Sequence, residues 1–290
     1  MNQFPSYTQS ILPMSVDGTF NLDPKKARIF GESLCEEYCF AEPFPHIVLD
    51  NFLPQESIEK IFSEFPKISL KGDKFYEEGY SGLHKRQILP ESCSIEARNF
   101  FHYLNSAPFL QFLEGLTAID GLVGDPYFDG GGFHEISRGG KLGVHADFRI
   151  NERLHLHRRI NVLIYLNKDW MSEWGGHLEL WDKKMESNVK SILPIFNRCV
   201  IFSTDADSYH GHPEPLTCPA EITRKSMALY YYTASKNLYD EVPTHSTKYM
   251  HRPGDGFLVN KAVLKSKFLN AARDWLPPII IRSVTNRSKK

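Results

Sequence analysis

Residues 145–167 read HADFRINERLHLHRRINVLIYLN, and this stretch decides the fold. It begins near the end of a predicted strand, Lys141–Phe148, and it finishes in a second apolar run, Arg159–Leu166. On a strand, side chains two positions apart point to the same face, so His145 and Asp147 can address a single metal ion. A hydrogen-bonded pair at a strand end, without any metal, is the alternative interpretation. The stretch predicts a β core with a candidate metal site at one strand end.

The middle of the chain consists of short apolar runs separated by glycine and turn residues. Such a pattern is typical of an antiparallel β-sandwich or barrel. Further strands are expected at His177–Trp181, Ser191–Leu193, Cys199–Phe202 and Ser226–Tyr232. Before the core, apolar positions recur at three- and four-residue intervals, as they do in amphipathic helices. Helices are expected at Asp23–Tyr38, Pro54–Phe65, Ser94–Leu104 and Pro108–Leu116, with a short strand at Phe44–Asp50.

The chain contains no repeat, linker or low-complexity tract that would divide it, so we expect one domain over residues 1–290. The expected fold class is α+β with a mainly β core over residues 131–233. Residues 1–130 are expected to form an N-terminal elaboration of helices and a strand. Residues 234–290 are expected to form a C-terminal helical extension, with an amphipathic helix at Asn260–Trp275.

Composition and charge exclude several classes of protein. The chain has 34 Lys and Arg against 35 Asp and Glu, and this balance argues against a nucleic-acid partner. The five cysteines are widely spaced and include no CxxC pair, so neither a disulfide framework nor a structural zinc site is indicated. We find no signal peptide and no run of about 20 apolar residues, which argues against a membrane association. We therefore expect a cytoplasmic protein, and the sequence leaves its oligomeric state open.

Residues downstream of the His-x-Asp pair strengthen the metal hypothesis. His210 is followed by Arg224 and Ser226, which open the last predicted strand and share one of its faces. Two neutral imidazoles and one carboxylate on one side of a ferrous ion form a facial triad that leaves three positions open. Two of these positions can chelate a 2-oxo acid, and the third can take dioxygen. A buried arginine can then hold the distal carboxylate of the 2-oxo acid, with a serine hydroxyl as second donor.

The region from about residue 131 to residue 233 resembles the iron(II)- and 2-oxoglutarate-dependent oxygenases. The similarity is to the prolyl-4-hydroxylase-like branch, whose core is a double-stranded β-helix, or jelly roll. It covers about a third of the chain, in motifs that keep the family's order and approximate spacing. The matching motifs are His145-x-Asp147, Arg159–Asn167 with Lys168-Asp169-Trp170, Gly175-Gly176, His210-Gly-His-Pro and Arg224-Lys-Ser226.

The resemblance implies a set of roles for named residues. The implied iron ligands are His145, Asp147 and His210. His212 has the same parity as His210 and remains an alternative for the distal ligand. The implied binding site for the C5 carboxylate of 2-oxoglutarate consists of Arg224, Ser226, Tyr165 and Asn161.

The same resemblance implies the reaction. Fe(II) is the expected cofactor, 2-oxoglutarate and O2 are the expected co-substrates, and ascorbate is a candidate reductant. Succinate and CO2 are released while an unactivated C–H bond is oxidised by hydroxylation, desaturation or oxidative cyclisation. Because the carboxylate ligand Asp147 is present, no position is vacated for chloride, which argues against halogenation.

The basic segment Arg149–Arg159 provides the first hypothesis about the substrate. If Arg153 and Arg158 form a cationic rim, the substrate is a small, acidic biosynthetic molecule. If the segment is an exposed loop, it carries no such meaning. By the strand period Arg159 is expected to point inward, and His134 is expected either to line the pocket or to pack in the core. The alternatives are a peptidyl-prolyl 4-hydroxylase acting on a protein and, from another class, a non-catalytic jelly-roll binding protein.

Overall fold

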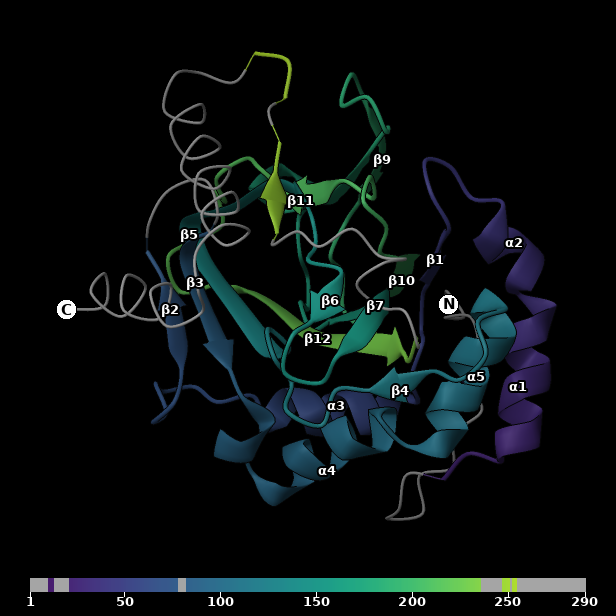
Figure 1. Ribbon diagram of the computed structural model, residues 1–290. Helices are drawn as coiled ribbons and strands as arrows, with labels where there is room; N and C mark the ends of the chain where they lie inside the picture. Colours follow the sequence, from purple (N-terminus) through teal and green to yellow (C-terminus); the bar gives the residue numbers. More distant parts are fainter. Residues whose placement is uncertain (1–9, 13–20, 78–81, 236–246, 251, 255–290) are drawn as a thin grey trace, which may run out of the picture.

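The computed structural model describes residues 10–12, 21–77, 82–235, 247–250 and 252–254, so the helix expected at Asn260–Trp275 lies outside the described residues. The described part is a curled β core with helices along one side (Figure 1). The expected mainly β class with N-terminal helices is thereby confirmed. None of the described helices has the length and apolar composition that crossing a bilayer requires.

The N-terminal helices are α1 (Pro24–Ser33), α2 (Cys35–Cys39), α3 (Gln55–Ser63), α4 (Ile95–Leu104) and α5 (Ala107–Thr117). The single helix expected before residue 39 is divided at Leu34, whose backbone N–H donates to the carbonyl of Gly31 at 3.0 Å in a tighter, 3₁₀-type turn. Gly31 also brings α1 into direct backbone contact with α5, because a Cβ atom there would lie 2.2 Å from the carbonyl oxygen of Phe112. Any side chain at this position would force the helices apart.

The β core consists of two antiparallel sheets that share one strand, β5 (Gly132–Ala146). The first sheet runs in the order β1 (His46–Leu49), β10 (Cys199–Ser203), β7 (Leu156–Tyr165), β12 (Arg224–Thr233), β5, β3 (Leu83–Ile88) and β2 (Lys74–Tyr76). The second runs β13 (Lys248–Tyr249), β5, β11 (His210–His212), β8 (Leu178–Trp181) and β9 (Asn188–Ile192). Short strands β4 (Val123–Gly124) and β6 (Ile150–Asn151) pair with β12 and β7. This strand order matches the expected double-stranded β-helix.

Strand β5 serves both sheets because it changes partners halfway along its length. Its first half pairs with β12 and β3, whereas Leu142 and His145 in its second half pair with β11. The change occurs at two glycines. Gly139 has φ of 79°, a conformation that favours glycine, and a Cβ on Gly140 would lie 2.4 Å from the side chain of Ile136. The strand therefore begins at Gly132, well before the run expected from Lys141, and carries residues to both walls of the core.

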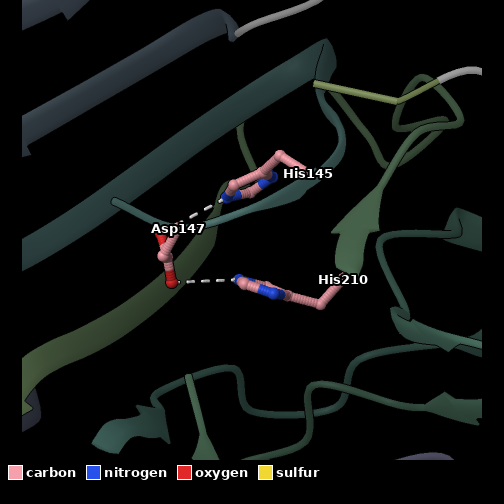
Figure 2. A group of neighbouring side chains, drawn as sticks. All are labelled: His145, Asp147 and His210. Atoms are coloured by element: carbon pink, nitrogen blue, oxygen red, sulfur yellow. Dashed lines mark ion pairs between the residues drawn. The ribbon is translucent and has the colours of Figure 1, made fainter. Parts of the chain in front are cut away.

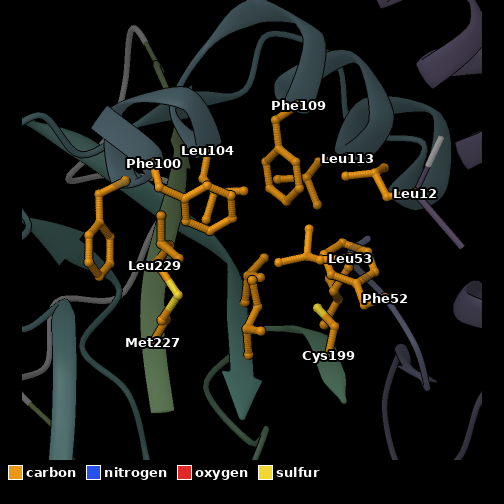
Figure 3. Close-up of a cluster of buried hydrophobic side chains, with 14 of the residues drawn as sticks. Leu12, Phe52, Leu53, Phe100, Leu104, Phe109, Leu113, Cys199, Met227 and Leu229 are labelled. Carbon is orange, nitrogen blue, oxygen red and sulfur yellow. The ribbon is translucent and has the colours of Figure 1, made fainter. Parts of the chain in front are cut away.

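The main apolar core lies between the helices and the outer face of the first sheet (Figure 3). Phe133 of β5 is packed between two rings, with Phe65 and Phe101 each at a centroid distance of 4.9 Å. Leu229 of β12 faces Leu104 of α4 in the same cluster. Because the helices cover this face, the opposite face of the first sheet is left for the second sheet and the polar residues between them.

Candidate active site

Three of the residues implied as metal ligands meet where β5 ends beside β11. His145 and His210 are direct Cα partners across these strands, and their ring centroids are 4.5 Å apart. Figure 2 shows both rings pointing at the carboxylate of Asp147, with each Nε2 atom 3.6 Å from one of its oxygens. One potential ligand atom from each residue lies within 4.8 Å of the others. The arrangement can therefore place three donors on one side of a single ion.

The two imidazoles are held in the orientation that a metal ligand needs. His145 Nδ1 lies 2.8 Å from the carbonyl of Gly143, and His210 Nδ1 lies 3.0 Å from the carbonyl of Ser208. A proton on each Nδ1 leaves the lone pair of Nε2 directed toward the common centre. Burial, and then the neighbouring His145, lower the pKa of His210 to about 4, so its ring is neutral at pH 7. Neutral imidazoles with one carboxylate fit a ferrous ion.

The carboxylate of Asp147 is held from behind by two side chains. Its Oδ2 atom accepts a hydrogen bond from Asn161 Nδ2 at 2.8 Å and lies 3.0 Å from Arg158 Nη2. Asn161 Oδ1 in turn accepts from Arg158 at 2.6 Å. Burial acts to raise the pKa of Asp147, but Arg158 and the two histidines outweigh it and hold that pKa well below its usual range. The residue is therefore an anion that can bind a cation at neutral pH.

Arg224 lies in the same cavity, at the start of β12. Its Nε donates to the carbonyl of Gly176 at 2.8 Å, and its Nη2 donates to the hydroxyl of Tyr165 at 3.3 Å. Gly176 has φ of 71°, and a Cβ there would press on the side chain of Arg224 at 3.0 Å, so this contact favours glycine. Ser226 lines the cavity beside Arg224, whereas Tyr165 lies behind the guanidinium and is not among the described lining residues.

The cavity between the two sheets has a volume of about 270 Å³ and joins the three-residue cluster to Arg224. His212 also lines it, farther along β11, and lies outside the cluster of potential ligand atoms. Both ring nitrogens of His212 are buried, and neither has a hydrogen-bond partner among the described residues. The geometry thus favours His210 over His212 as the third donor.

The basic segment does not form the rim that its sequence suggests. Arg158 is inside the cavity, with its guanidinium 3.6 Å from the ring centroid of Tyr230 and 4.6 Å from that of Phe148. Arg153 instead covers the ring of Tyr127 at 3.3 Å, and it is not among the described residues that line the cavity. Of these two arginines, only Arg158 contributes positive charge to the cavity, and it does so from inside rather than at a rim.

Arg159 does not point into the cavity, contrary to the expectation from the strand period. It donates to the hydroxyl of Thr233 at 3.4 Å and is absent from the described lining residues. The pairing of β7 with β12 shifts here: Tyr231 is opposite Ile160, but Tyr232 is opposite Arg158. Arg159 is thus the extra residue of a β-bulge, and a bulge reverses the alternation of faces beyond it. That reversal places Arg158 on the inner face that the regular period assigns to Arg159.

His134 lines the cavity, with its Nε2 atom 2.9 Å from the carbonyl oxygen of Gly130. Sequence reasoning missed Tyr76 of β2, Lys85 of β3 and Tyr230 of β12, which also line it. Strand β3 has a largely polar sequence and β2 is only three exposed residues long, so the apolar pattern that reveals a buried strand is missing from both. No local signal could show that β3 pairs with β5.

A family model described as the 2OG-Fe(II) oxygenase superfamily matches residues 131–232, which contain the three candidate metal ligands, Arg224 and the strands that carry them. The core of this chain is similar to that superfamily. The expected resemblance is therefore confirmed, and the superfamily's use of Fe(II) and 2-oxoglutarate fits the donors in the cavity.

Individual relatives within the superfamily include prolyl hydroxylases. A mouse protein named prolyl 3-hydroxylase OGFOD1 is 26% identical over 207 residues, which cover 67% of this chain but only 34% of the relative. The chain thus spans about a third of that protein's length. A prolyl-4-hydroxylase from Pseudomonas putida has a similar fold, with a TM-score of 0.51 and 17% identity over 71% of this chain and 100% of that chain. A prolyl hydroxylase from Trichoplax adhaerens, solved with a peptide, gives a TM-score of 0.49 and 18% identity over 72% of this chain and 91% of that one.

Proposed function

We propose that this chain is an Fe(II)- and 2-oxoglutarate-dependent oxygenase that oxidises an unactivated C–H bond of a small, acidic substrate and releases succinate and CO2. The observation that carries the proposal is the placement of His145, Asp147 and His210 in one buried cavity with Arg224. A non-catalytic binding protein would need neither three converging donors nor a second charged site in the same cavity. When bound, Fe(II) and 2-oxoglutarate supply the means to activate dioxygen.

The residues of the chain divide the work of holding these groups. His145 and His210 each keep Nε2 available by directing Nδ1 at a backbone carbonyl. Asp147 has Oδ2 engaged by Arg158 and Asn161, and its Oδ1 atom makes neither of these contacts. We assign Oδ1 to the metal, because an oxygen with fewer competing donors is the better ligand. The presence of this carboxylate favours hydroxylation, desaturation or cyclisation over halogenation.

Arg224 is assigned as the partner of the C5 carboxylate of 2-oxoglutarate. Its Nε and Nη2 atoms are fixed by Gly176 and Tyr165, so the guanidinium is oriented before any anion arrives. A fixed guanidinium fork loses little freedom when it binds a carboxylate. Ser226 is assigned as the second donor, since it lines the cavity next to Arg224. Tyr165 acts through Arg224 as a positioning residue, and Asn161 acts through Asp147 in the same way.

The substrate class rests on the charges of the cavity. Among its described lining residues, Lys85, Arg158 and Arg224 carry positive charge, and Asp147 is the carboxylate. A surplus of cations in the cavity wall favours an acidic substrate. Peptidyl proline is the second candidate, and the name of the mouse relative favours it. A peptide would be held mainly by backbone hydrogen bonds along a groove, so it depends less on these charges.

A direct test is the anaerobic titration of the protein with Fe(II) and 2-oxoglutarate. We expect one weak visible charge-transfer band per chain, and succinate release once oxygen is admitted. His145→Ala should abolish both, whereas His177→Ala should change neither, because His177 is not among the described residues that line the cavity. A mass-spectrometric screen for products at +16 or −2 mass units then separates small acids from proline-containing peptides. A wild-type protein that binds neither Fe(II) nor 2-oxoglutarate would refute the proposal.

A further inference from the structure

Lys85 of β3 is the cation in the cavity to which the proposed function assigns no particular group. Its Cα partner is Ile136 of β5, which is itself opposite Arg224 of β12, so three adjacent strands bring the two cations into one row. Lys85 lines the cavity together with Tyr76 of the neighbouring strand, and its Nζ atom lies 5.3 Å from the centroid of that ring. The β2–β3 hairpin thus contributes one charged and one aromatic side chain to the cavity wall.

The two arginines in the cavity have ion-pair or hydrogen-bond partners, whereas the ammonium group of Lys85 has neither among the described residues. Arg158 forms an ion pair with Asp147, and Arg224 is held by Gly176 and Tyr165. Among the described residues, no carboxylate lies within ion-pair distance of Lys85 and no hydrogen bond of its ammonium group is found. Burial lowers the pKa of Lys85 to about 8, against the opposing attraction of Asp147. The side chain is half-buried in the cavity wall, and with this pKa it is mainly cationic at pH 7.

A half-buried charge without an anionic partner is unfavourable, and one that faces a cavity suggests an anionic ligand. Iron(II) and 2-oxoglutarate would not change this balance, because their charges of +2 and −2 cancel. The cavity would thus keep its excess of cations after both had bound. Aromatic rings of Tyr76, Phe148, Tyr230 and Tyr249 line the same cavity as the three candidate metal ligands and supply apolar surface in the cavity that Lys85 also lines.

We infer that Lys85 forms the subsite for an anionic group of the primary substrate, a carboxylate or a phosphate on a small organic molecule. This inference rests on the proposed function and adds a specific recognition residue to it. The C5 carboxylate of 2-oxoglutarate is assigned to Arg224, which has its own fixed supports, so Lys85 remains for the second organic anion. The aromatic walls would contact the apolar part of that molecule.

The experiment uses three proteins: the wild type, Lys85→Met and Lys74→Met. Methionine keeps an unbranched side chain without the charge, and Lys74 is an exposed lysine on β2, the strand adjacent to β3. Each protein is loaded with Zn(II) under nitrogen, so that no turnover occurs, and 2-oxoglutarate is titrated into it first and kept saturating for the other probes. Dissociation constants are measured for 2-oxoglutarate by calorimetry, and for three probes by ligand-observed NMR: benzoate, its neutral isostere benzamide, and inorganic phosphate.

We expect benzoate or phosphate to bind the wild type, with benzoate about tenfold or more tighter than benzamide if the carboxylate is the recognised group. Lys85→Met should lower the affinity for that anion by about tenfold and leave the affinities for benzamide and 2-oxoglutarate nearly unchanged. Lys74→Met should have the affinities of the wild type. The probe that depends on Lys85 identifies carboxylate or phosphate as the recognised group.

Three results would overturn the inference while leaving the proposed function intact. The first is a wild type that binds 2-oxoglutarate but no anion, and the second is equal anion affinity of the wild type and Lys85→Met. The third is a loss of about tenfold in the 2-oxoglutarate affinity of Lys85→Met, which would assign Lys85 to the co-substrate. If instead the wild type fails to bind Zn(II) and 2-oxoglutarate, the proposed function itself is refuted.

Discussion

The guanidinium of Arg158 lies 3.0 Å from the carboxylate of Asp147, and both side chains are almost fully buried. The rings of Tyr230 and Phe148 flank the guanidinium, so its plane is fixed as well as its charge. This pair joins the proposed metal site to the wall of the substrate cavity. Arg158, the residue before the bulge in β7, thus orients the carboxylate that would hold the metal.

Arg158→Ala should weaken metal binding by about 10- to 100-fold, the usual effect of removing a group that orients a metal ligand. It should also lower the free energy of unfolding of the metal-free protein by about 3–5 kcal/mol, because Asp147 would remain buried without its cationic partner. Zn(II) titration and urea unfolding measure the two effects. Arg153→Ala is the matched control, since its side chain covers Tyr127 instead. Equal metal affinity in both variants would contradict the role of Arg158.

Arg224→Ala should weaken 2-oxoglutarate binding by about 2–5 kcal/mol with little change in metal affinity, because a buried carboxylate loses its charged partner. Tyr165→Phe should have a smaller effect, since it removes only the hydroxyl that orients Arg224. Calorimetry with Zn(II)-loaded protein gives both constants. Lys225→Ala is the control on the same strand, because Lys225 lies on the other face, 3.7 Å from Glu135. If Lys225→Ala weakens 2-oxoglutarate more than Arg224→Ala does, the anchor has been assigned to the wrong residue.

His210→Ala should abolish Fe(II) binding, while His212→Ala should retain it. The reason is that His210 belongs to the cluster of potential ligand atoms and His212 lies outside it. Fe(II) affinity of the two purified variants, measured anaerobically, decides between them. The opposite pattern, in which only the His212 variant loses the metal, would move the third ligand two residues along β11.

Gly31→Ala should destabilise the protein by about 1–3 kcal/mol, as overpacking of a close helix contact does. The added methyl group would collide with the carbonyl oxygen of Phe112 and separate α1 from α5. Thermal or urea unfolding measures the loss. Lys25→Ala, at an exposed position of the same helix, should leave stability within about 0.5 kcal/mol of the wild type. Equal stability of the two variants would show that the helices can move apart without cost.

Acid should destabilise the fold through His157. Burial, followed by the cations Arg159 and Arg149, lowers the pKa of His157 to about 4, whereas an unfolded histidine titrates near 6.5. Between these values the unfolded chain binds a proton that the folded chain does not. The stabilisation present above pH 6.5 is therefore lost progressively as the pH falls to about 4.

The variant His157→Gln should lose less stability than the wild type when the pH is lowered from about 7 to about 5. Glutamine retains an acceptor for the hydrogen bond from Arg149, so the comparison isolates the titration. Urea unfolding at both pH values measures the difference. Asn188→Gln, at an exposed position of β9 that does not titrate, serves as control and should behave like the wild type. Identical pH dependence in wild type and His157→Gln would exclude His157 as the cause.

Much of the core and the cluster of candidate ligands could be predicted from the sequence, because both depend on local patterns. His145 and Asp147 share a strand face by a period of two, and Arg224 opens a strongly apolar strand. The fate of Arg158 and Arg159 could not be predicted, because a bulge depends on how β7 pairs with β12 rather than on either sequence alone.

Lys85 was missed for a related reason. Strand β3 has polar residues on both of its faces, and it borders the core only through its pairing with β5. Pairing between strands that are about 50 residues apart leaves no periodic signal in either. The break at Leu34 was also missed, because the apolar spacing continues through it and only the hydrogen-bond pattern changes.

The bend of β5 at Gly139 and Gly140 has a consequence for how the molecule opens. One continuous strand is hydrogen-bonded into both sheets, so neither sheet can detach without breaking the pairing of the strand that also holds the other. Amide hydrogens of β11 and β12 should therefore exchange with solvent in one cooperative event rather than in two. Loss of the metal-binding cluster during unfolding would then coincide with loss of the whole β core.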